Sequence, residues 1–138
     1  QMLYKNRQIE RQPHGAAEEV NKMVKNITAD NFGSAVLASD RPVLVGFSAS
    51  GCRPCRILRP TLEDISDDLA GVLDVATVDI GVDAPLAKDY NIAAVPTMLL
   101  FVGGKPADKL VGLQSHQEIE ESIMCALGVE TYGYTSEQ

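Results

Sequence analysis

The chain has 138 residues, a formal net charge of −7 and 45% hydrophobic residues. This length and apolar content suit one domain with a single core, and the acidic balance argues against a nucleic-acid-binding surface, which needs clustered Lys and Arg. No apolar run has the length of a membrane span, and the first residues lack the apolar core of a signal peptide. We therefore expect a cytoplasmic protein that binds neither nucleic acid nor membranes.

The first residues of the chain predict little regular structure. Residues 1–20 are polar and show no sustained apolar periodicity, so we expect a flexible arm. A single domain over residues 21–128 is predicted to follow. It begins with an edge strand at Met23–Ile27, and Thr28 then offers an N-cap for a short helix with Phe32 and Val36 on one face.

A C-x-x-C motif, formed by Cys52 and Cys55, follows a short apolar strand candidate. That candidate, Pro42–Phe47, is short and rich in β-branched residues, as a central strand covered on both faces would be. After the motif, apolar residues recur on one helical stripe at Leu58, Leu62, Ile65 and Leu69. The two cysteines are therefore expected where a strand passes into the N-terminus of a helix.

This position favours thiol chemistry. Free N–H groups and the positive end of the helix dipole stabilise a thiolate at Cys52, and the thiolate is the form that attacks disulfides. Cys55, one turn further on, is the candidate resolving thiol that closes a disulfide with Cys52. Pro54 suits the first turn, where its missing N–H costs little. Further positive charge near this helix end comes from Arg53, Arg56 and Arg59.

A structural zinc site is the main alternative for the cysteine pair. Zinc takes about four protein ligands, and outside the pair the chain offers only Cys125, His14 and His116. Asp79 and Asp83 are interpreted as surface charge, because no third carboxylate stands at suitable spacing. We therefore predict no metal ion and no organic cofactor.

The polar residues of the long helix are expected to face solvent. Asp64, Asp67 and Asp68 are interpreted as its solvated face, and Glu63 is placed to pair with Arg59 across one turn. Beyond Gly71, the expected order is strand Val75–Ile80, a short helix at Pro85–Tyr90, strand Thr97–Val102, a Gly103-Gly104 turn and strand Ala107–Leu113. Gly112 indicates either a bulge or close approach of another backbone.

The last helix opens with Ser115-His-Gln-Glu118, a capping-box pattern. Its inward stripe is predicted to hold Ile119, Ile123 and Leu127. His116 is expected to face solvent, and Cys125 to be a passive, partly exposed thiol that does not reach Cys52. Residues 129–138 show no periodicity and are predicted to be a tail.

From about Lys22 to Gly128 the chain resembles the thioredoxin family. The resemblance lies in Val-Leu-Val-Gly-Phe-Ser-Ala before the cysteines, Cys52-x-Pro54-Cys55, Pro60, Val95-Pro96-Thr97 and Val111-Gly112. It implies an α/β thioredoxin fold, with a central mixed sheet of four or five strands flanked by helices on both faces. It also implies that Pro96 is cis and packs against the cysteine pair, and that Ala94 and Val95 offer backbone groups to an extended substrate.

Several residues depart from the family pattern. Gly46 stands where the family carries a buried aspartate, and Thr77 stands where it carries a lysine. Gly51 and Ser48 replace two tryptophans, and Arg53 replaces a glycine. Losing a carboxylate and gaining a cation both favour a thiolate, so we expect a disulfide couple more oxidising than that of an ordinary thioredoxin.

The resemblance implies a thiol–disulfide oxidoreductase that reduces protein disulfides as a monomer, with a donor similar to thioredoxin reductase returning its electrons. The expected substrate groove is formed by Gly51, Arg53, Pro54, Ala94, Val95, Pro96 and Gly112. Two alternatives remain open at this point: an oxidase- or isomerase-like protein, and a non-catalytic adaptor or chaperone that keeps the fold.

Overall fold

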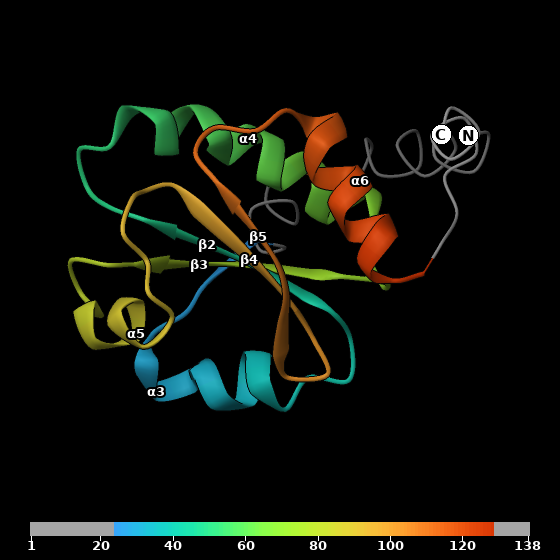
Figure 1. The fold of residues 1–138 in the computed structure, drawn as a ribbon, viewed down its shortest axis with the longest axis horizontal. Coiled ribbons are helices and arrows are strands. Elements are labelled where there is room, and N and C mark those ends of the chain that lie inside the picture. Colours follow the sequence, from blue (N-terminus) through green and yellow to red (C-terminus); the bar gives the residue numbers. More distant parts are fainter. Residues whose placement is uncertain (1–23, 129–138) are drawn as a thin grey trace, which may run out of the picture.

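The computed structural model describes residues 24–128, in which a five-stranded sheet lies between two layers of helices (Figure 1). The predicted N-terminal arm and C-terminal tail fall outside these residues. The strands are β1 (Val24–Asn26), β2 (Val43–Ser48), β3 (Asp74–Asp79), β4 (Thr97–Val102) and β5 (Lys105–Val111). Their order in the sheet is β1-β3-β2-β4-β5, with β1, β3 and β2 parallel and β4 and β5 antiparallel to their neighbours.

The helices divide between the two faces of this sheet. They are α3 (Ala29–Phe32) with the π-helical turn η2 (Gly33–Leu37), α4 (Arg53–Asp68), α5 (Ala84–Asp89) and α6 (His116–Ala126). Helices α3 and α5 lie on one face, and α4 and α6 lie on the other (Figure 1). The expected mixed sheet with helices on both faces, the thioredoxin fold, is confirmed. None of the helices between residues 24 and 128 is long and apolar enough to cross a bilayer.

Strand β2 lies at the centre of the sheet and is its most covered strand. Val43 to Phe47 are all buried, as predicted from their β-branched composition. The strand pairs with β3 on one side and β4 on the other. Its side chains alternate between the two cores: Val45 and Phe47 pack toward α3 and α5, and Leu44 packs toward α4 and α6. The end of β2, where the cysteines follow, is therefore held firmly.

An aromatic group fills the core beneath α3 and α5. The ring of Phe101 packs edge-on against Phe32 and Tyr90, with centroids 5.7 and 5.3 Å apart. Burial, with a smaller contribution from the Asp89 carboxylate, raises the pKa of Tyr90.

Helix α4 buries more than the predicted apolar stripe. Leu58, Leu62 and Ile65 face the core as expected, and Arg59 pairs with Glu63 at 3.2 Å. The prediction that Asp67 and Asp68 belong to a solvated face is wrong: each is only 7% exposed. The reason is tertiary, because α6 packs over the C-terminal half of α4 (Figure 1).

The contact between these helices also corrects the prediction for His116. Its Nε2 lies 3.2 Å from Oδ2 of Asp68, and the imidazole is only about one-third exposed. The capping box of α6 is confirmed, since Ser115 Oγ accepts the N–H of Glu118 and the Glu118 carboxylate accepts the N–H of Ser115. The start of α6 is thus capped and tied to α4.

The β4–β5 hairpin turns at Gly103 and Gly104, as predicted, with φ angles of +63° and +82°. Strand β5 begins and ends two residues earlier than expected, so Gly112 lies just beyond it. The bulge prediction for Gly112 is wrong, because the register irregularity lies at Leu100 and Phe101. No atom outside its chain neighbours approaches within 4 Å of a Cβ built there. Its φ of +88° is the reason for glycine.

We predict that Gly104→Ala destabilises the fold far more than Gly103→Ala. A Cβ on Gly104 would lie 2.7 Å from the carbonyl oxygen of Leu37, whereas a Cβ on Gly103 meets open space. Both variants carry the strain of a positive φ, roughly 1 kcal/mol, and Gly104→Ala adds the clash, for a total of about 2 kcal/mol or more. Urea denaturation of both variants measures the difference. Equal losses would contradict the close-approach argument.

Candidate functional site

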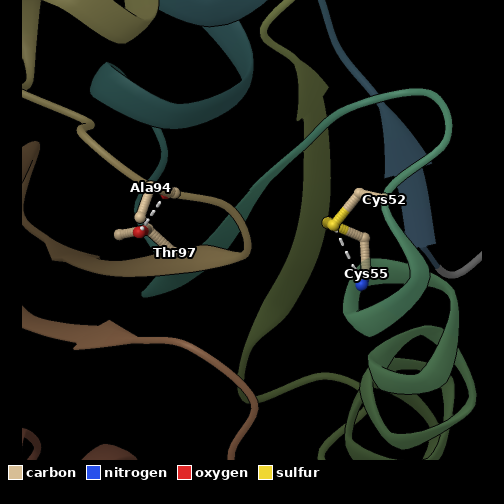
Figure 2. The surroundings of a disulfide bond; sticks show 4 residues. All are labelled: Cys52, Cys55, Ala94 and Thr97. Atoms are coloured by element: carbon tan, nitrogen blue, oxygen red, sulfur yellow. Dashed lines mark hydrogen bonds between the residues drawn. A yellow bond between two sulfur atoms is a disulfide. The ribbon is translucent and has the colours of Figure 1, made fainter.

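The cysteine pair lies at the junction of β2 and α4. Cys52 is the N-cap of α4 in an extended conformation, and its N–H donates to the carbonyl of Ala49 at 3.3 Å. Cys52 and Cys55 form a disulfide with Cα atoms 5.3 Å apart. The N–H of Cys55 also donates to Sγ of Cys52 at 3.2 Å (Figure 2). A free helix N–H therefore already faces the sulfur at which a thiolate would form.

Exposure of the motif decides which atoms a substrate reaches. Gly51, Arg53 and Pro54 are exposed, while Cys52 and Cys55 are half-buried. Gly51 has a φ of +78°, a left-handed conformation that glycine adopts without strain. Pro54 lies in the first turn of α4, as predicted.

The loop before β4 carries the predicted proline. The Val95–Pro96 peptide bond is cis, as the family resemblance implies. The Thr97 hydroxyl donates to the Ala94 carbonyl at 2.7 Å (Figure 2), and the N–H of Gly112 donates to the Pro96 carbonyl at 2.8 Å. These bonds hold the loop and tie it to the end of β5. Ala94 is exposed, Val95 is half-buried and Pro96 is buried.

A small hollow joins this proline to the cysteine pair. It has a volume of roughly 30 Å³, about the size of one water molecule, and is lined by Gly46, Phe47, Ser48, Cys55, Leu58, Arg59, Leu62, Thr77 and Pro96. Pro96 and Cys55 thus line the same small hollow. Gly46 adds no side chain, and Arg59 is the only charged residue of the lining.

Gly46 and Thr77, which stand where the family carries an aspartate and a lysine, pair here with uncharged groups. Thr77 pairs with Gly46 across β2 and β3, and its hydroxyl donates to Oδ1 of Asn26 at 2.6 Å. No signal in the sequence pointed to Asn26, because the bond joins residues 51 positions apart. Arg59, expected to add positive charge near this end of the helix, lines the hollow together with Cys55.

The remaining candidate residues lie apart from this site. Cys125 is exposed on α6 and is not in a disulfide, as predicted. Asp79 and Asp83 line a second hollow beyond Arg59. Within residues 24–128 no three His, Cys, Asp or Glu side chains come together as a metal site.

Comparisons with known proteins agree with this geometry. The thioredoxin family model matches residues 23–124. The chain is 38% identical to a thioredoxin of Mycolicibacterium smegmatis over 73% of this chain and 92% of that protein. It is 40% identical to a thioredoxin of Rickettsia bellii over 73% of this chain and 96% of that protein. A bifunctional thioredoxin reductase/thioredoxin of Mycobacterium leprae is 38% identical over 62% of this chain and 19% of its own length.

A disulfide closed across one turn at the N-terminus of a helix, beside a cis-proline loop, defines a thiol–disulfide oxidoreductase. With the matches above, the chain belongs to the thioredoxin family. The adaptor alternative is not favoured, because the family match and the closed cysteine pair both point to redox activity.

We predict that Gly46→Asp lowers the reactivity of the cysteine pair. A carboxylate here would line the hollow beside Cys55 and disfavour a thiolate. The new Cβ would lie 3.3 Å from Cδ1 of Leu62, so Leu62 must shift slightly. The measurement is the alkylation rate of the reduced protein from neutral to alkaline pH. The pH at which this rate rises should be higher in the variant. Gly46→Asn is the matched uncharged control, and an equal change in both variants would refute the electrostatic argument.

Proposed function

We propose that this protein reduces protein disulfides through a cycle in which Cys52 is the nucleophile and Cys55 the resolving thiol. The observation that carries the proposal is the position of Cys52 at the N-cap of α4, in a disulfide with Cys55 one turn away. The helix dipole and the N–H of Cys55 favour negative charge on the Cys52 sulfur. Cys55, unlike Cys52, lines the small hollow, which suits the second step rather than the first.

The cycle balances in atoms and electrons. The Cys52 thiolate attacks one sulfur of the substrate disulfide, forming a mixed disulfide and releasing the other sulfur as a thiolate that takes up a proton. The Cys55 thiolate then attacks Sγ of Cys52. The bond between Cys52 and the substrate breaks, the Cys52–Cys55 disulfide forms, and the second substrate sulfur leaves as a thiol. Two electrons and two protons pass from the protein to the substrate.

The proposed substrate groove runs beside the cysteines. Gly51, Arg53 and Pro54 form one side, and the exposed or half-buried backbone of Ala94 and Val95 can pair with an extended segment. Pro96 and Gly112 form the other side, where the N–H of Gly112 donates to the carbonyl of Pro96. Val111 and Leu113, about half exposed, give this rim an apolar surface. Arg53 favours substrates with acidic residues near the disulfide.

A reductant must restore the dithiol after each cycle. We infer that a thioredoxin reductase serves here, because the M. leprae relative carries a reductase and a thioredoxin in one chain, by its name. We also propose that the protein acts as a monomer in the cytoplasm. Beside the C-x-x-C pair these 138 residues hold only one cysteine, Cys125, which leaves no second pair for a structural disulfide within them. This cysteine content fits a reducing compartment.

An oxidase- or isomerase-like role is the second candidate. The observation that favours it is the absence of any carboxylate from the lining of the hollow at Cys55, together with Arg53 next to Cys52. Both features stabilise the reduced, thiolate form and so make the disulfide a better oxidant.

We predict that Cys52→Ser abolishes the reduction of insulin disulfides, whereas Cys55→Ser stops turnover but accumulates a mixed disulfide at Cys52. The difference follows from the order of the two attacks. Turnover assays with dithiothreitol and non-reducing electrophoresis measure both outcomes. Cys125→Ser is the control and should retain full activity, since its thiol is exposed on α6. A mixed disulfide trapped in Cys52→Ser instead would reverse the assigned roles.

The reduction potential separates the two directions of the reaction. Equilibration with glutathione buffers, followed by trapping of free thiols, should yield a value above thioredoxin's, which is about −270 mV. A value at or below that figure would refute the more oxidising couple. One between about −180 and −120 mV would assign the protein to the oxidases and isomerases.

A further inference from the structure

The hollow at Cys55 contains one charged side chain, and that side chain is a cation. Phe47, Leu58, Leu62 and Pro96 give the lining its apolar part, and the hydroxyls of Ser48 and Thr77 are neutral. Among the residues that the structure describes, Arg59 therefore carries the only full charge in the lining of the hollow beside the resolving cysteine. Its side chain is 38% exposed, so solvent screens part of this charge, while the apolar lining screens it less than water would.

The helix itself brings Arg59 close to Cys55. Cys55, Arg59 and Glu63 follow one another at intervals of four residues along α4, so their side chains form one row on the helix surface. Neighbours in such a row have Cβ atoms about 5–6 Å apart. Nε of Arg59 donates to Oε2 of Glu63 at 3.2 Å, and the arginine side chain is 38% exposed. Arg59 thus lies between Cys55 and Glu63 in this row, with its guanidinium hydrogen-bonded to Glu63.

Arg59 also faces a second, larger hollow of roughly 340 Å³, which it shares with Ser48 and Thr77. Two carboxylates line that hollow. Oδ1 of Asp79 accepts the N–H of Gly81, and Oδ2 of Asp83 is buried with no hydrogen-bond partner among the described residues. Ser48, Arg59 and Thr77 line both hollows, whereas Asp79 and Asp83 line only the larger one, so neither carboxylate belongs to the lining at Cys55.

We propose that Arg59 is a positioning residue for the second step of the cycle, in which it stabilises the Cys55 thiolate that attacks the mixed disulfide. The inference rests on the proposed function. The Cys55 thiol loses its proton to solvent, and its electron pair forms the bond to Sγ of Cys52 as the substrate sulfur leaves. Burial of Cys55 opposes the charged sulfur, and Arg59 offsets that penalty. Glu63 weakens this stabilisation, because its carboxylate pairs with the same guanidinium.

The test uses the reaction of the reduced protein with dithiobis(nitrobenzoate) in a Cys125→Ser background, because the exposed Cys125 would react too. Cys52 releases one coloured nitrothiobenzoate in a first phase, and Cys55 releases the second by resolution. Arg59→Gln should slow the second phase about three- to tenfold, the loss expected for a thiolate deprived of a nearby cation. The first phase should change much less, and Arg59→Lys should restore most of the second.

Two further variants separate this effect from net charge. Arg41 is likewise a partly exposed arginine paired with a carboxylate, Asp74 at 3.8 Å, but it precedes β2 while the cysteines follow it. Arg41→Gln should therefore leave both phases unchanged. Glu63→Gln removes the competing anion and should accelerate the second phase. Equal slowing by Arg59→Gln and Arg41→Gln, or equal slowing of both phases, would overturn the proposal.

A second measurement needs no disulfide exchange. In a Cys52→Ser, Cys125→Ser protein only Cys55 is left to alkylate. The pH at which the alkylation rate of Cys55 rises should be higher in Arg59→Gln and should return to its original value in Arg59→Lys. An unchanged pH profile in Arg59→Gln would overturn the proposal. This measurement involves no substrate. A failure of the protein to reduce disulfides would therefore refute the proposed function and leave the result for Arg59 unaffected.

Discussion

The site depends on one constraint, the direct passage from the buried strand β2 into the N-terminus of α4. Pairing on both sides holds the end of β2, and Cys52 caps the helix four residues later. The sulfur therefore meets the unpaired N–H groups and positive dipole of a helix whose apolar face anchors it in the core. The cis-proline loop, tied to Gly112, completes the same edge. Each part of the site is placed by the sheet rather than by the cysteines.

The charge beside Cys55 at this junction is positive, whereas the family pattern places a buried aspartate there. The hollow at Cys55 holds neutral groups at Gly46 and Thr77 and a cation at Arg59, so no carboxylate among the described residues of its lining opposes a thiolate. Thr77 instead bonds to Asn26 at the edge of the sheet. In the proposed cycle, the uncharged groups at Gly46 and Thr77 and the cation at Arg59 would favour the thiolate of the second cysteine.

The predictions that failed share a physical cause. Periodicity along α4 identified its apolar stripe, but the burial of Asp67 and Asp68 comes from α6, which crosses the helix from a distant part of the chain. His116 was misjudged for the same reason, because its partner Asp68 lies 48 residues away. For Gly112 only the bulge was wrong: the residue lies beyond the end of β5 with a positive φ, and the backbone of Pro96 does approach it, through a 2.8 Å hydrogen bond.

By itself the sequence determined the elements and the chemistry. Apolar runs, capping patterns and the glycine turn located the strands and helices within a few residues, and the C-x-x-C motif at a helix start identified the reactive pair, because these signals act between residues close in the chain. Only the tertiary structure decided which groups surround that pair. The hollow at Cys55 is assembled from β2, β3, α4 and the proline loop. Contacts of that range leave no periodic trace, so the bond between Asn26 and Thr77 and the full lining of the hollow emerged only from the fold.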